Sequence, residues 1–179
     1  MERRRHVKDT LEMINQMQAA GVIGRYAIGG AVGATFYLEP FATQDIDIFV
    51  SLQNVSGSPL LSLTPIYEYL TARGCRVERE YLVIGNWPVQ FLPPCDALDE
   101  EALAQAIETD VDGIPTRVMT AEHLVAIALR TGRIKDTIRV KLFIESGVLD
   151  AVRLDDMLTR HGLLPKWEKL ARQYRDENV

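Results

Sequence analysis

Two neighbouring segments carry most of the information in this chain: Tyr26-Ala-Ile-Gly-Gly-Ala-Val-Gly-Ala-Thr-Phe-Tyr-Leu38 and Thr43-Gln-Asp-Ile-Asp-Ile-Phe-Val50. The apolar residues before the glycine pair predict a short strand, and residues 31–38 predict a helix. Polar and apolar residues alternate over residues 45–50, which predicts a second strand. The glycines are therefore expected at a strand-to-helix turn, followed by a strand that carries two carboxylates.

Asp45 and Asp47 are predicted to form a metal site. Residues two apart in a strand project from the same face, so the two carboxylates would stand side by side. Like charges at that distance repel and lose hydration when covered, so the pair favours a bound cation. Mg²⁺, or Mn²⁺ in its place, prefers oxygen ligands, and such a site is typically completed by substrate phosphates. A nucleoside triphosphate is therefore the expected ligand.

The pair Gly29-Gly30 has the properties that a triphosphate site needs. Glycine has no Cβ, so it permits unusual backbone angles and lets main-chain N–H groups approach an anion closely. A helix that starts at the turn adds a favourable partial positive charge. A dinucleotide-binding turn is disfavoured, because Ile28 occupies the position of its first glycine, and a P-loop is excluded, because no Gly-Lys-Ser/Thr follows.

With these motifs the chain resembles the DNA polymerase β-like nucleotidyltransferase superfamily, in which a Gly-Gly or Gly-Ser turn precedes an Asp-x-Asp strand. It looks most similar to small bacterial nucleotidyltransferases related to the toxin of abortive-infection toxin–antitoxin systems. The segment Arg133-Ile-Lys-Asp136 is similar to an Arg-x-Lys-Asp element that follows the catalytic domain in such relatives. The resemblance implies nucleotide binding by Gly29, Gly30 and Lys135, with Asp45 and Asp47 catalytic.

The sequence departs from that family at its third carboxylate. The best-matching stretch is Pro88-Val-Gln-Phe-Leu92, which places Gln90 where the relatives carry Asp. An amide oxygen is able to bind a metal, but it brings no charge and cannot accept a proton from an attacking hydroxyl. Three interpretations stay open: Gln90 weakens transfer, the strand register differs by one residue, or another carboxylate acts as base, the candidates being Glu78, Glu80 and Asp96.

The bulk composition restricts the class of protein. A chain of 179 residues, nearly half apolar and a quarter charged, is typical of one globular domain with a possible helical extension. The net charge of −5 argues against a protein whose whole surface binds nucleic acid by neutralising its phosphates. Two cysteines without C-x-x-C spacing predict no disulfide framework or structural zinc. No apolar stretch reaches the length of a membrane span, and the protein is expected to be cytoplasmic.

The order of expected elements predicts an α+β fold. A helix over residues 2–20 precedes the two motifs. After them we expect a helix at 60–73, strands at 76–84 and 88–92, a helix at 99–109 and a strand at 114–119. Helices alone follow Thr120, with breaks at Gly132, Gly147 and Gly162. We therefore expect a small mixed sheet with helices packed on it (residues 1–118), followed by a carboxy-terminal helical bundle (119–179). The resemblance implies the same nucleotidyltransferase fold.

Basic residues cluster in the helical region, at Arg130, Arg133, Lys135, Arg139 and Lys141. They are expected either to bind phosphates or to be solvated and paired with Asp136 and Glu145. His123, in the first turns of a helix, is expected on the helix surface.

Two functions follow. The first is a metal-dependent nucleotidyltransferase that moves a nucleoside monophosphate to a hydroxyl of RNA, protein or a small molecule, with a toxin role and an antitoxin partner suggested by the resemblance alone. The second is a catalytically weak or inactive protein of the same fold that binds nucleotide or a protein partner, and Gln90 is its main support.

Overall fold

The computed structural model describes residues 2–40, 42–52 and 62–177, with side chains from residue 7 to residue 176 outside the two internal gaps. Its strands are β1 (Tyr26–Ile28), β2 (Ile46–Val50), β3 (Arg76–Glu78), β4 (Tyr81–Ile84), β5 (Trp87–Leu92), β6 (Ile107–Val111) and β7 (Ile114–Val118). Its helices are α1 (Glu2–Ala19), α2 (Gly30–Ala34), α3 (Thr64–Thr71), α4 (Ala97–Ala104), α5 (Ala121–Thr131), α6 (Ile134–Ser146), α7 (Ala151–Arg160) and α8 (Leu164–Glu177).

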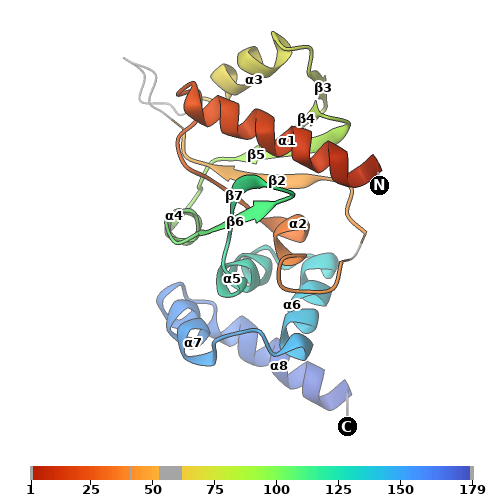
Figure 1. Cartoon of the computed structure of the whole chain (residues 1–179). Coiled ribbons are helices and arrows are strands. Elements are labelled where there is room, and N and C mark those ends of the chain that lie inside the picture. The colour runs from red at the N-terminus through yellow and green to blue at the C-terminus, as the bar shows by residue number, and fades with distance from the viewer. Residues whose placement is uncertain (1, 41, 53–61, 178–179) are drawn as a thin grey trace.

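The strands form one mixed sheet in the order β3-β4-β5-β2-β1-β7-β6. Strand β2 is antiparallel to β1 and parallel to β5, and β1 is parallel to β7. Both motif strands therefore lie at the centre of the sheet, where each has a neighbour on either side. The predicted order, a mixed sheet with helices and then helices alone, is confirmed (Figure 1).

Each face of the sheet has its own core. Helices α1 and α3 pack on one face, and α2, α4 and the helices from α5 onward lie on the other (Figure 1). Ile46, Ile48 and Val50 of β2 belong to the α1 side, whereas Phe49 belongs to the α5 side. The alternation that the sequence predicts for β2 is therefore real, and it directs Asp47 toward the carboxy-terminal helices.

Three predicted elements need correction. Residues 107–111 form strand β6 in place of the end of a helix, because Ile107 to Val111 pair with β7. The predicted strand at 76–84 is broken by a turn at Arg79, whose φ is +59°, giving the hairpin β3–β4. Helix α2 ends at Ala34, four residues before the predicted end, so it is too short to add a useful helix dipole.

Local helix signals are confirmed in the second half of the chain. The Thr120 hydroxyl accepts a hydrogen bond from the His123 N–H and so caps α5, while Gly132 and Gly147 end α5 and α6 with positive φ. No helix among the described residues is long and apolar enough to cross a bilayer. The division at residue 118 stays a prediction.

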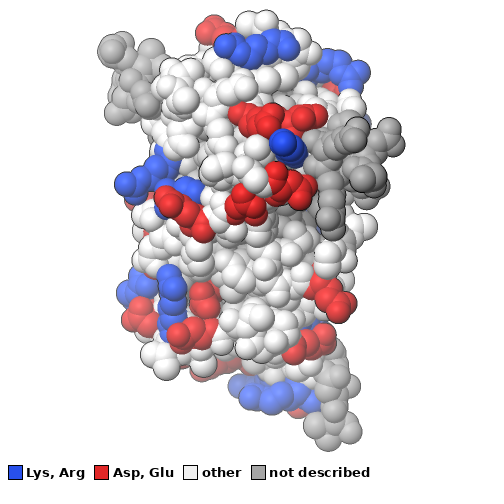
Figure 2. Space-filling model, in the orientation of Figure 1, with Lys and Arg blue, Asp and Glu red and all other residues white. Residues whose placement is uncertain are grey.

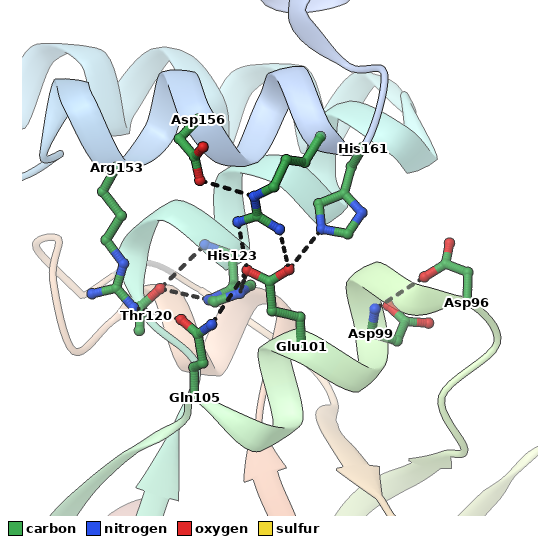
Figure 3. Close-up of polar contacts among 10 residues, drawn as sticks. Asp96, Asp99, Glu101, Gln105, Thr120, His123, Arg153, Asp156 and His161 are labelled. Carbon is green, nitrogen blue, oxygen red and sulfur yellow. Dashed lines mark hydrogen bonds and ion pairs between the residues drawn. The ribbon is translucent and has the colours of Figure 1, made fainter.

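Glu101 of α4 joins the sheet to the carboxy-terminal helices (Figure 3). Its carboxylate accepts hydrogen bonds from both terminal nitrogens of Arg160, at 2.6 and 2.9 Å, and lies 2.9 Å from Nε2 of His161. Arg160 also donates to Asp156 at 2.8 Å. The Arg160 fork and His161 hold the pKa of Glu101 at about 2, so the carboxylate is charged in this contact.

Candidate active site

A cavity of about 360 Å³ lies between the central strands and helices α5 and α6. Asp45, Asp47 and Gln90 line it from the sheet, and Arg133, Lys135 and Arg139 line it from the start of α6. Its volume is within the range of small-molecule sites. Residues that are 90 positions apart in sequence thus face one another, with oxygen ligands on one wall and cations on the other.

The two carboxylates are placed differently. Asp47 lies within β2, whereas Asp45 directly precedes that strand, so only one of the two is part of the sheet. Burial and the neighbouring charge of Asp45 raise the pKa of Asp47, although Lys135, Arg133 and Arg139 oppose the shift. Asp47 is therefore a partly buried carboxylate whose charged form is disfavoured mainly by the loss of hydration.

The glycine turn is built against Asp47. The N–H of Gly29 donates to the Asp47 carbonyl oxygen at 2.9 Å, which ties the turn to β2. Gly30 has φ +55°, and a Cβ there would lie 1.8 Å from Oδ2 of Asp47. A Cβ on Gly29 would lie 2.7 Å from the ring of Phe49. Both glycines are thus required by close packing on β2, a reason that the sequence pattern did not supply.

Gln90 is the direct neighbour of Asp47. Strands β2 and β5 are parallel, and Asp47 is paired in register with Gln90. Both side chains line the cavity with Asp45. In this register it is Gln90, and not the residue before or after it, that pairs with Asp47. The amide therefore lies beside the two carboxylates.

The three carboxylates considered as alternative bases have different surroundings. Asp96 is paired with Arg130, which also donates to Asp99 at 2.8 Å. Glu78 contacts Arg76 at 3.5 Å and lines another cavity, of about 410 Å³, that it shares with Asp45. Glu80 lies in the turn after β3 and lines none of the cavities around Asp45 described here. Among the three, Glu78 is the carboxylate that faces a cavity in common with the Asp45 side chain.

The basic cluster divides into paired and unpaired members. Asp136 is buried and accepts hydrogen bonds from the Arg133 backbone N–H and side chain, closing the first turn of α6 as a capping box. Arg139 contacts the same carboxylate at 3.4 Å. Lys135 forms no ion pair with a carboxylate of the described residues. It is the cavity-lining cation most available for a phosphate.

Sequence reasoning missed Tyr81 and misplaced His123. The Tyr81 hydroxyl donates a hydrogen bond to Oδ2 of Asp45 at 3.2 Å, and the long sequence separation left no signal for this contact. His123, expected on a helix surface, is fully buried, with Nδ1 2.8 Å from the Thr120 hydroxyl and Nε2 3.5 Å from Glu101. The apolar residues that surround His123 in sequence were the available signal for burial.

Cys95, Asp96 and Asp99 form a further cluster of potential ligand atoms beside the cavity. Arg130 already neutralises its two carboxylates, and the Cys95 thiol lies 3.0 Å from Asp99, which raises the thiol pKa. This cluster is therefore an internally satisfied network that supports one wall of the cavity.

The fold was compared with known proteins. No protein-family model and no curated protein matches the chain. Among solved structures, the antibiotic-resistance factor ANT(2'')-Ia in solution has a TM-score of 0.55 at 17% identity, covering 95% of this chain and 98% of its own. The crystal structure of ANT(2'')-Ia in complex with adenylyl-2''-tobramycin has a TM-score of 0.55 at 15% identity, covering 93% and 99% of the two chains.

A third structure, an antigenic nucleotidyltransferase-like protein from Paracoccidioides brasiliensis, has a TM-score of 0.60 at 12% identity and covers 96% of this chain and 93% of its own. At such low identities the likeness concerns the fold. All three cover nearly the full length, including the helices that follow the sheet. This chain therefore has the nucleotidyltransferase fold.

Proposed function

We propose that this protein is a metal-dependent nucleotidyltransferase, which moves a nucleoside monophosphate from a nucleoside triphosphate to a hydroxyl acceptor. The observation that carries the proposal is the cavity in which Asp45, Asp47 and Gln90 face Lys135 and the arginines of α6. A triphosphate needs both groups of residues, since its metal ions bind to carboxylates and its remaining negative charge to cations.

The residues fit Mg²⁺ or Mn²⁺. The donor atoms are carboxylate and amide oxygens, which hard divalent cations prefer. Burial, and after it the charge of Asp45, raises the pKa of Asp47, and a bound cation would oppose both effects. The Tyr81 hydroxyl donates to one oxygen of Asp45 and so orients that carboxylate. When bound, the metal supplies Lewis-acid stabilisation of the attacking and leaving oxygens.

The protein groups have separate tasks in this proposal. Asp45 and Asp47 hold the metal, with Gln90 as a neutral third ligand, and the Gly29-Gly30 turn lets the phosphates approach the backbone. Lys135 binds the phosphates that leave as pyrophosphate. The acceptor oxygen forms a bond to the α-phosphorus while the bond from that phosphorus to the bridging oxygen breaks. Gln90 accepts no proton, so we assign Glu78 as the group that takes the acceptor's proton.

A small-molecule acceptor is favoured over RNA. One structural neighbour carries adenylyl-2''-tobramycin, the product of transfer to a small molecule. Among the described residues on the face shown in Figure 2, basic side chains lie in separate groups, divided by acidic and uncharged areas, and form no continuous basic surface. A toxin role and an antitoxin partner rest on the sequence resemblance alone.

A second function is favoured by one specific observation. Gln90 stands in register with Asp47. The family resemblance implies a third carboxylate at this position, where this chain carries an amide. A protein with this substitution that binds nucleotide and metal without transfer is the alternative, and it predicts nucleotide binding with no labelled product.

The test is transfer of label from each α-labelled nucleoside triphosphate, with Mg²⁺ or Mn²⁺, to components of a cell extract. We expect labelled product with the wild type and none with Asp45→Asn, at unchanged melting temperature. The matched control is Asp112→Asn, a substitution at an exposed turn residue with φ +50°, which should keep full activity. Equal activity in Asp45→Asn would refute the assignment of the site. Nucleotide binding without product would select the alternative function.

A further inference from the structure

A second cavity, of about 570 Å³, opens beside the candidate active site. It shares four residues with the first cavity, namely Asp45, Tyr81, Lys135 and Arg139. Because Asp45 is a proposed metal ligand, a molecule in this second cavity lies next to the position where the acceptor hydroxyl has to arrive.

The outer wall of the second cavity is apolar. Ile138 and Leu142 line it from α6, Ala31 lines it from α2, and Ala42 lines it from the loop before β2. Ile138 is 56% exposed and Leu142 37% exposed, and with Ile134, which is 83% exposed, they follow one another at i, i+4 and i+8 along one face of α6. Large apolar side chains that are exposed in a row beside a cavity typically mark a binding surface.

The charges of this cavity set the kind of ligand. Lys135 and Arg139 are its cations, and Asp45, which the proposed metal neutralises, is its acidic residue. A polycation such as tobramycin would find no carboxylate there beyond Asp45. Because Lys135 is assigned to the phosphates of the nucleotide, a ligand with one anionic group would instead be able to pair with Arg139, which lines this cavity and contacts Asp136 through one terminal nitrogen at 3.4 Å.

We propose that the second cavity is the acceptor subsite, and that the acceptor is a hydroxyl-bearing small molecule with an apolar body and an anionic group. The inference rests on the proposed function, because it assigns the hydroxyl to the metal-site carboxylate Asp45. The apolar body contacts Ile138 and Leu142, the anionic group pairs with Arg139, and the hydroxyl points toward Asp45 and Tyr81. The cavity that Glu78 lines shares Gln44, Asp45 and Tyr81 with this one, so the proposed proton acceptor lines the adjoining cavity.

The test uses 1-anilinonaphthalene-8-sulfonate, a fluorescent probe with an apolar ring system and one anionic group. We expect saturable binding to the wild type that persists with Mg²⁺ and a saturating non-hydrolysable ATP analogue. Ile138→Asp should lower the affinity for the probe about tenfold, which corresponds to a loss of about 1.4 kcal/mol of binding free energy from apolar contact. The matched control is Val152→Asp, at a residue of α7 that is 81% exposed and lines none of the cavities around Asp45, and it should bind the probe like the wild type.

Competition identifies the ligand class. Dodecanoate, with an apolar chain and one carboxylate, should displace the probe, and tobramycin should not. The proposal is overturned if the ATP analogue displaces the probe, if Ile138→Asp binds it like the wild type, or if dodecanoate fails to compete. Mn²⁺ and nucleotide binding are measured on the same samples. If the wild type binds neither Mn²⁺ nor nucleotide, the proposed function is refuted. If it binds both but the probe gives one of the contrary results above, only the acceptor subsite is refuted.

Discussion

Gly30 and Asp47 share one volume: a Cβ on the glycine would lie 1.8 Å from Oδ2 of the carboxylate, so the side chain of Asp47 occupies the space that any other residue at position 30 would need. This contact joins the turn after β1 to the proposed metal ligand on β2. The geometry of the site therefore depends on the absence of a Cβ at position 30.

Gly30→Ala should therefore abolish metal binding. The new Cβ displaces the Asp47 carboxylate, and alanine at φ +55° adds backbone strain of about 1–2 kcal/mol. The matched control is Gly113→Ala, at φ +84° with no atom within 4 Å of its Cβ, which carries the strain without the displacement. Mn²⁺ binding followed by electron paramagnetic resonance should be lost in the first variant and kept in the second. Equal Mn²⁺ affinity in both would contradict the proposed ligand.

Gln90→Asp should complete the metal site. A third carboxylate beside Asp47 adds repulsion in the absence of metal, so the melting temperature should fall in chelator. Added Mn²⁺ should raise it above that of the wild type at the same Mn²⁺ concentration, because a tighter-binding ligand stabilises the folded state more. Gln16→Asp, at an exposed position of α1, is the control and should show neither effect. A melting temperature that does not respond to Mn²⁺ would place Gln90 outside the metal site.

Glu78→Gln should slow transfer by about 10²–10⁴-fold if Glu78 accepts the acceptor's proton. The substitution removes the proton acceptor and keeps the size of the side chain. Glu80→Gln, two residues along the same hairpin, is the matched control and should leave the turnover number unchanged. The measurement is single-turnover transfer at saturating nucleotide. If both variants transfer at the wild-type rate, the proton has another acceptor.

Glu101→Gln should lower the free energy of unfolding by about 1–3 kcal/mol. The charged carboxylate binds Arg160 and His161, and the neutral amide cannot accept the same charge-assisted hydrogen bonds. Glu100→Gln, the exposed neighbour on α4, serves as control and should change the free energy of unfolding by less than about 0.5 kcal/mol. Urea unfolding at pH 7 measures both. Identical midpoints would show that this contact adds no net stability.

His123 should make stability depend on pH. Burial lowers the pKa of His123 to about 4, from the ordinary value of 6.5 that applies to the unfolded chain. Between those values the unfolded chain binds a proton that the folded chain does not, so the free energy of unfolding decreases as the pH falls from 6.5 toward 4. Below that window, protonation of Glu101 removes further stability as the pH approaches 2.

Urea unfolding at pH 7, 5.5 and 4.5 measures this effect. His123→Gln should be less stable than the wild type at pH 7 but show a smaller loss between pH 7 and 4.5. The wild type measured at the same three pH values is the reference. Parallel pH dependence in the two proteins would assign the titration to other groups.

Local sequence signals gave those parts of the fold that depend on neighbouring residues. The alternation at Asp45 to Val50, the cap at Thr120 and the glycine ends of α5 and α6 all follow from side chains a few positions apart. Residues 107–109 were expected to form the end of an acidic helix over residues 99–109. Their pairing with β7 overrides this local preference through hydrogen bonds to a second segment.

The candidate site likewise combines residues that a local pattern predicts with contacts that only the tertiary structure creates. Residue type and spacing predicted a metal and phosphate site at Gly29, Gly30, Asp45 and Asp47, and the family resemblance added Lys135. The structure places Gly30, Asp45, Asp47 and Lys135 around one cavity, and their roles stay predictions. The sequence was unable to place Gln90 in register with Asp47, bring Tyr81 to Asp45 or bury His123 against Glu101. Those contacts join residues that are tens of positions apart, and they exist only because packing of the sheet against α4, α5 and α6 fixes their distances.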